Sequence, residues 1–256
     1  MSIHSPTPPT PHVHILGVPI HAATFESLLA SIGQWIEERA PTRQICTVSP
    51  EFVMIAQDNA DFMRVLRQAD LCVADGVGLL WAARHLGRAL PERVTGSDGV
   101  PLIAERAARE GWRLYLLGAA PGVAERAADV LRARYPGVQI VDTYAGSPAP
   151  EEEAAIVARV NASGADVLFV AYGAPQQDQW IARNRAQLRV HVAMGVGGTF
   201  DFLAGVVPRA PRWMRRLGLE WLFRLLRQPW RWRRMLRLPR FVWAVWRHRE
   251  RPLSET

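Results

Sequence analysis

Short apolar runs alternate with longer amphipathic stretches along most of the chain. The short runs have the length of strands and are bounded by turn-forming residues, which predicts β-strands over residues 14–18, 44–48, 71–74, 113–117, 138–142, 167–170 and 192–194. Between them, apolar positions at helical spacing predict helices over residues 24–38, 59–68, 76–86, 121–135, 150–161 and 175–185. Strands and helices that alternate in this way predict an α/β domain with a mostly parallel sheet and flanking helices.

Glycine, hydroxyl and amide groups follow five of the predicted strands. In a parallel sheet these strand ends meet at one edge, which is where α/β proteins bind ligands. Glycines at the start of a helix let a phosphate approach the backbone amides, so several such loops favour a nucleotide-type ligand. No Walker motif and no G-x-G-x-x-G opens a first βαβ unit, which argues against an NTPase or a dehydrogenase. The ligand contacts we expect at this edge are Ser49, Gly76, Gly118, Gly173, Gly195, Gly197, Gly198 and Asp201.

Asp75 is the main candidate for a catalytic group. It directly follows a buried apolar run and precedes Gly76. A carboxylate in this place can act as the general base that deprotonates a sugar hydroxyl. The alternative is that Asp75 only caps the helix that starts at Gly76, a common role for aspartate. The strand-end loops otherwise offer Asp178 and Asp201, and no histidine or cysteine, which favours the catalytic interpretation.

Three other residues are candidates for the same site. Arg93 can bind an anion or merely pair with Glu92, and Thr47 and Gln177 can orient hydroxyl groups. Groups of His, Asp, Glu and Cys with the spacing of metal ligands are absent from the sequence, so we expect no catalytic metal and no other cofactor.

The rest of the composition limits where the protein works. Cys46 and Cys72 each stand inside an apolar run, which predicts reduced core residues of a cytosolic protein. The Pro-rich start of the chain lacks the pattern of a signal peptide, and we expect residues 1–13 to be disordered. An uncharged apolar run long enough to span a bilayer, about 18 residues, is also absent, so any membrane contact should be peripheral.

The charge of the chain is divided unevenly. Residues 208–251 hold 14 Arg, 2 Glu and 6 of the 10 Trp, a formal charge of +12, whereas the remaining residues carry −5. The breakers Pro208 and Pro211 lie in a linker over residues 205–211. We therefore predict an α/β core over residues 1–207 and a basic amphipathic appendage over residues 208–256 that binds an anionic surface.

The pattern within the appendage favours a membrane as this surface. Trp213, Leu217, Trp221 and Leu225 recur every four residues and predict one helix face, while Pro229 and Pro239 should divide the run into short helices. Trp at headgroup depth with Arg toward anionic lipid is typical of an interfacial helix. Two alternatives remain: helices packed on the protein's own body with a solvated Arg face, or nucleic-acid binding through Arg and stacked Trp, which we do not expect because the loops contain no nuclease-like set of residues.

Five motifs together resemble one protein family. They are Thr47-x-Ser-Pro-Glu51, Ala74-Asp-Gly-x-Gly78, Arg93-x-x-Gly-x-Asp98, Gly173-x-Pro-x-Gln-Asp178 and Gly195-Val-Gly-Gly-x-Phe-Asp201, in this order, followed by the Arg/Trp-rich end. From about residue 14 to about residue 240 the chain resembles the WecG/TagA/CpsF family of bacterial glycosyltransferases. One departure is Ser49, where many members of the family have Asn.

The resemblance implies a fold and a reaction. Members of the family have a Rossmann-like core, invert configuration, and move a sugar from a UDP-sugar to a polyprenyl-diphosphate-linked saccharide at the cytoplasmic membrane. It further implies that Asp75 is the base and that Thr47, Arg93 and Gln177 line the pocket. The C-terminal appendage then meets the membrane and completes the site, with Arg224, Arg231 and Arg234 near the diphosphate.

Two functions of different class follow from the sequence. The first is a hexosyl- or N-acetylhexosaminyltransferase of surface polysaccharide synthesis, peripheral on the inner face of the cytoplasmic membrane. The second is a non-catalytic module that binds a nucleotide sugar and recruits a partner to the membrane, for which Asp75 would have no use as a base. The sequence leaves open which sugar is moved and whether the protein forms a homo-oligomer.

Overall fold

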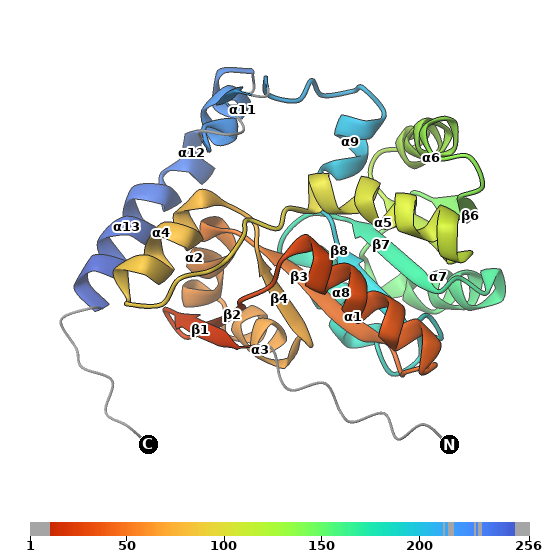
Figure 1. Ribbon diagram of the computed structural model, residues 1–256, viewed down its shortest axis with the longest axis horizontal. Helices are drawn as coiled ribbons and strands as arrows, with labels where there is room; N and C mark the ends of the chain where they lie inside the picture. The colour runs from red at the N-terminus through yellow and green to blue at the C-terminus, as the bar shows by residue number, and fades with distance from the viewer. Residues whose placement is uncertain (1–10, 212, 215–217, 228, 230–231, 249–256) are drawn as a thin grey trace.

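A six-stranded parallel sheet forms the centre of the computed structural model, which describes residues 11–211, 213–214, 218–227, 229 and 232–248 (Figure 1). The strand order is β4-β3-β8-β7-β5-β6. The bounds are β3 (Arg43–Val48), β4 (Leu71–Ala74), β5 (Arg113–Gly118), β6 (Gln139–Tyr144), β7 (Val167–Ala171) and β8 (Val192–Gly195). The four inner strands are buried along almost their whole length, which is why they read as continuous apolar runs. The predicted parallel α/β sheet is confirmed.

Helices cover both faces of the sheet and bury two sets of strand side chains. The helices on one face are α1 (Phe25–Glu37), α5 (Gly96–Glu110), α6 (Val123–Arg134) and α9 (Thr199–Leu203). Those on the other are α2 (Pro50–Asp58), α3 (Ala60–Gln68), α4 (Val77–His85), α7 (Pro150–Ser163) and α8 (Gln176–Asn184). Cys46 and Cys72 are buried and free, as the sequence predicted.

The prediction of a single N-terminal strand is wrong. Instead of one strand over residues 14–18, the chain makes an antiparallel hairpin of β1 (His12–Ile15) and β2 (Val18–His21). Leu16 and Gly17 form the turn with φ of 50° and 82°, a conformation that Gly adopts without strain and that pairs well with the twist of a hairpin. Strand β1 also begins inside the stretch that we expected to be disordered, of which residues 1–10 lie outside the described part.

The C-terminal segment differs from the predicted helix stripe. Gly218 has a φ of 72°, and α11 (Glu220–Arg227) begins only after it, so residues 213 and 221 do not share one continuous helix. Leu217 itself lies outside the described residues. Pro239 is not a breaker either: it occupies the first turn of α13 (Arg237–His248), where the missing N–H costs little. A short helix, α12 (Trp232–Met235), precedes α13.

Helix α13 packs on the core instead of standing apart from it. Phe241 and Val245 are buried against α2 and α4. Arg237 and Arg240 form ion pairs of 2.9 Å with Glu51 and Asp58 of α2. This part of the segment therefore follows the alternative of helices packed on the body, and the division of the chain at residue 207 stays a prediction. Among the described residues, no helix has the length and apolar character to cross a bilayer.

Candidate functional site

The five strand-end loops lie side by side along the carboxyl edge of the sheet. The strand order places the ends of β4, β3, β8, β7 and β5 next to one another, in that order. Asp75 follows β4, Thr47 is the second-last residue of β3, Gly197 follows β8, Gly173 follows β7, and Gly118 ends β5. Segments far apart in the sequence thus form one continuous edge, which is the usual ligand site of an open α/β sheet.

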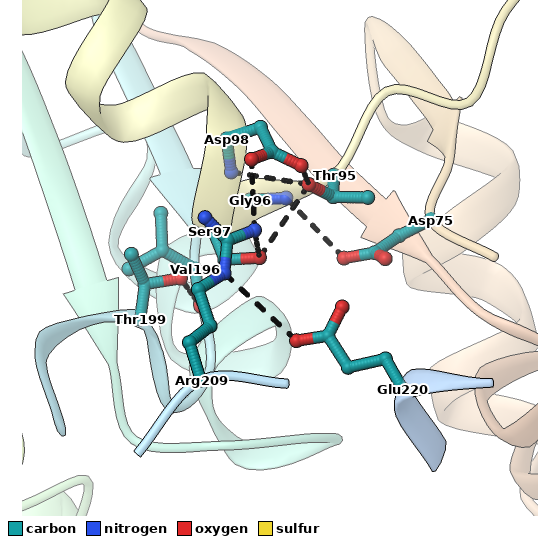
Figure 2. Close-up of polar contacts among 9 residues, drawn as sticks. All are labelled: Asp75, Thr95, Gly96, Ser97, Asp98, Val196, Thr199, Arg209 and Glu220. Carbon is teal, nitrogen blue, oxygen red and sulfur yellow. Dashed lines mark hydrogen bonds and ion pairs between the residues drawn. The ribbon is translucent and has the colours of Figure 1, made fainter. Parts of the chain in front are cut away.

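Asp75 does not cap the helix that follows it. The N-cap of α4 is Gly76, with a φ of 144° and no side-chain capping bond. The half-buried Asp75 carboxylate turns instead to the first residue of α5, where its Oδ2 accepts a hydrogen bond of 3.3 Å from the Gly96 amide (Figure 2). Because helix N-termini attract anionic groups, this contact holds the carboxylate at the edge of the sheet. Asp75 therefore contacts the start of α5 and is not the N-cap of α4.

The glycines at this edge divide into two groups. A Cβ on Gly195 would lie 2.6 Å from both the Asp178 Oδ1 and the Gln177 Nε2, and one on Gly118 would lie 2.8 Å from the Ala171 backbone. A side chain at either position would clash with its neighbours, and Gly118 also has a φ of 104°, which favours glycine. Gly173 and Gly197, with φ of 77° and 55°, have open space where a Cβ would stand. Their backbones are therefore the ones that a ligand could approach closely.

Thr47 and Ser49 both have local structural roles. The buried Thr47 hydroxyl donates a bond of 2.9 Å to the Gly195 carbonyl, which ties the end of β3 to β8. Ser49 caps α2, and its Oγ accepts a bond of 3.4 Å from the Phe52 amide. Each hydroxyl oxygen keeps a lone pair for another partner. The Gln177 side chain is fully buried, and its Oε1 accepts a bond of 2.9 Å from the Gly197 amide. Gln177 thus holds the loop after β8.

The remaining predicted residues of the site are Arg93, Asp201 and three arginines of the C-terminal segment. Arg93 is half-buried, and within the described residues it forms no ion pair, with Glu92 or with any other carboxylate. Asp201, also half-buried, lies in α9 with its Oδ2 3.4 Å from where a Gly198 Cβ would stand. Arg231 and the side chains of Arg224 and Arg234 lie outside the described part of the chain. Groups of three potential metal ligands do not occur among the residues that the structure describes.

A polar network around Arg209 was not foreseen from the sequence. The Arg209 Nη2 donates bonds of 2.9 Å to Ser97 and 2.8 Å to Asp98, and its Nε lies 3.9 Å from the Glu220 Oε1 of α11 (Figure 2). Thr95 caps α5 by accepting from the Asp98 amide at 3.1 Å. Arg209 therefore joins the linker and α11 to the same helix start that Asp75 contacts. The one signal in the sequence was a lone Arg between Pro208 and Pro211.

Asp178 is fully buried beneath this edge, and its two oxygens find no hydrogen-bond donor among the described residues. Burial raises the pKa of Asp178 to about 7. A raised pKa means that the folded protein holds a proton that the unfolded chain releases near pH 4, so Asp178 stabilises the fold fully only below that pH. Its contribution is lost as the pH rises toward 7.

We therefore expect Asp178→Asn to remove this part of the pH dependence of stability. Between pH 4 and pH 7 the free energy of unfolding of the variant, relative to the wild type, should rise by at most about 1.4 kcal/mol per pH unit, because Asn needs no proton. Urea unfolding at a series of pH values measures the difference, and the surface substitution Asp61→Asn serves as the control. Parallel curves for wild type and Asp178→Asn would show that Asp178 is ionised at all these pH values.

The fold defines an α/β protein with a six-stranded parallel sheet, and open α/β sheets bind ligands at the carboxyl ends of their strands. The chain matches the glycosyl transferase WecG/TagA/CpsF family over residues 13–255. Two similar proteins are named N-acetylglucosaminyldiphosphoundecaprenol N-acetyl-beta-D-mannosaminyltransferase. The one from Bacillus spizizenii is 35% identical over 80% of this chain and 79% of its own length, and the one from Bacillus subtilis is 32% identical over 78% of each. The chain belongs to the WecG/TagA/CpsF family of glycosyltransferases.

Proposed function

We propose that the protein is an inverting glycosyltransferase that moves a sugar from a UDP-sugar to a polyprenyl-diphosphate-linked saccharide in the synthesis of a bacterial surface polysaccharide. Membership of the family supports transfer of a sugar. The names of the two Bacillus relatives support an N-acetylhexosamine as the sugar and an undecaprenyl-diphosphate-linked N-acetylglucosamine as the acceptor. The observation that carries the proposal is the position of the Asp75 carboxylate. It accepts a hydrogen bond from the Gly96 amide at the edge of the sheet where the strand-end loops lie side by side.

In the proposed reaction Asp75 takes the proton from the acceptor hydroxyl. The acceptor oxygen attacks the anomeric carbon from the face opposite the diphosphate, the bond from that carbon to the diphosphate oxygen breaks, and UDP leaves with the electron pair. The open backbones of Gly173 and Gly197 can approach the donor phosphates. The arginines of the C-terminal segment would stabilise the leaving diphosphate, since the planar guanidinium binds two oxygens at once.

The proposal is tested with a panel of labelled UDP-sugars and polyprenyl-diphosphate acceptors. We expect transfer to a lipid-linked N-acetylglucosamine with inversion at the anomeric carbon, which NMR of the product reports. A second candidate, a module that binds nucleotide sugars and recruits a partner without turnover, agrees less well with the way Asp75 is held. It would be favoured if donors bind tightly and no acceptor is ever glycosylated.

Metal removal tests the chemistry of the leaving group. We expect that EDTA leaves most of the transferase activity intact, because arginines would supply the positive charge that Mg²⁺ or Mn²⁺ supplies elsewhere. The measurement is the initial rate with and without EDTA, with a Mn²⁺-dependent glycosyltransferase as the control for chelation. Loss of activity that Mn²⁺ alone restores would contradict the metal-independent mechanism.

A further inference from the structure

Helix α13 has two apolar faces, and the core accounts for only one of them. Phe241 and Val245, four residues apart, are buried against α2 and α4. Val242, Trp243 and Trp246 lie on a different side of the helix, and 47%, 56% and 56% of their surfaces are exposed. Large apolar side chains grouped on a soluble surface are characteristic of binding sites. No part of the chain that the structure describes buries this second face.

The exposed face of α13 borders a hollow. The hollow has a volume of about 470 Å³ and is lined by Trp81 of α4 together with Pro239, Val242, Trp243 and Trp246 of α13. Trp81 is 39% exposed and stacks on His85, with 5.4 Å between the ring centroids, so its indole is held in place. All five lining side chains are apolar or aromatic. Such a surface suits a hydrocarbon and offers little to a sugar or a nucleotide.

The hollow lies on the helix that starts beside Asp75. Helix α4 begins at Val77, two residues after Asp75, and Trp81 lies about one turn further along, roughly 6 Å at 1.5 Å per residue. Val77 is itself 41% exposed. Because residues four apart share one side of a helix, Val77 and Trp81 form an apolar stripe that leads from the catalytic candidate to the hollow.

We propose that this hollow, which we call the α4/α13 groove, binds the isoprenoid chain of the lipid-linked acceptor. The inference rests on the proposed function, because that function requires an acceptor with a long branched hydrocarbon next to its diphosphate. A concave surface fits a single chain better than it fits a bilayer, into which side chains must protrude. Two arginines border the same surface: the Arg247 guanidinium lies 5.0 Å from the centre of the Trp243 ring, and Arg84 stands one turn after Trp81.

The test compares two acceptors with the same saccharide diphosphate, one on a long polyprenyl chain and one on a short water-soluble chain. In Trp81→Ala and Trp243→Ala we expect the KM for the long-chain acceptor to rise about tenfold, with kcat and the short-chain KM unchanged, because each change removes apolar contact area and leaves Asp75 and the strand-end loops as they are. Trp213→Ala is the matched control, since Trp213 is 60% exposed in the same basic segment but lies outside the groove.

Two further measurements, binding of polyprenyl phosphate and adsorption to liposomes, distinguish lipid binding in the groove from contact with the membrane and from sugar transfer. The first is binding of tritiated polyprenyl phosphate without any sugar, in detergent micelles, which should weaken about tenfold in the groove variants only. If all three Trp variants lose liposome adsorption equally and the two acceptors remain indistinguishable, the surface contacts the bilayer and the proposal is wrong. If polyprenyl phosphate binds through Trp81 and Trp243 but no sugar is transferred, the groove stands and the proposed function fails.

Discussion

Asp75→Asn should lower turnover by a factor of about 10² to 10⁴ while the fold and donor binding stay as they are. A general base contributes acceleration of that order, and an amide cannot accept the proton. The substitution is nearly isosteric, and the Asn oxygen can still accept the hydrogen bond from the Gly96 amide that is 3.3 Å long in the structure. The loss should therefore fall on kcat, because the position of the side chain is kept and only its basicity is removed.

The measurement is the steady-state rate of sugar transfer, together with thermal melting and donor binding of the same preparation. Asp61→Asn is the matched control, since it removes one negative charge from a carboxylate on α3 whose side chain is 75% exposed. It should transfer sugar at the wild-type rate. Turnover of Asp75→Asn within about threefold of wild type, with unchanged melting, would exclude Asp75 as the base.

The sheet was predictable because its four inner strands are buried and appear in the sequence as mostly apolar runs. The structure places each of the strands β3 to β8 within two residues of the predicted ends, including the edge strand β6, which is only partly buried. The hairpin was missed because Leu16, an apolar residue, occupies a turn position with a φ of 50°, so the apolar run continues through the turn. Helix α5 was missed because Gly96, Gly99 and Pro101 are poor helix residues, and tertiary packing outweighs their low propensity.

The site was predictable as far as it depends on where strands end. Asp75 could be chosen because it follows a strand and precedes a glycine, but its partner Gly96 is 21 residues away, so its role as a cap could be rejected only in the structure. The contact from Arg209 to Asp98 spans 111 residues, and the groove joins Trp81 to α13. Such contacts depend on how helices pack across the sheet, which local patterns do not encode.

Substitution of single C-terminal arginines should also lower turnover strongly. Arg231→Ala or Arg234→Ala removes one of 14 arginines in residues 208–251, and one basic residue near an anionic surface is worth about 1 kcal/mol. Adsorption to the membrane should therefore persist in either variant. If the same arginine contacts the diphosphate in the transition state, turnover should fall at least about tenfold, because a charge-assisted bidentate contact is lost where charge develops.

Both quantities should be measured on the same preparations: sedimentation with phosphatidylglycerol liposomes, and transfer to a water-soluble short-chain acceptor. Arg240→Ala is the matched control, since it removes the same charge from α13, where Arg240 is bound 2.9 Å from Asp58 on the outside of the core. In Arg240→Ala we expect turnover at the wild-type rate and membrane adsorption weakened by no more than the loss of one charge explains, about 1 kcal/mol. If Arg231→Ala and Arg234→Ala also transfer sugar at the wild-type rate, these two arginines only attract the membrane. Stabilisation of the leaving UDP must then come from other groups, either Arg224 of the same segment or the strand-end loops.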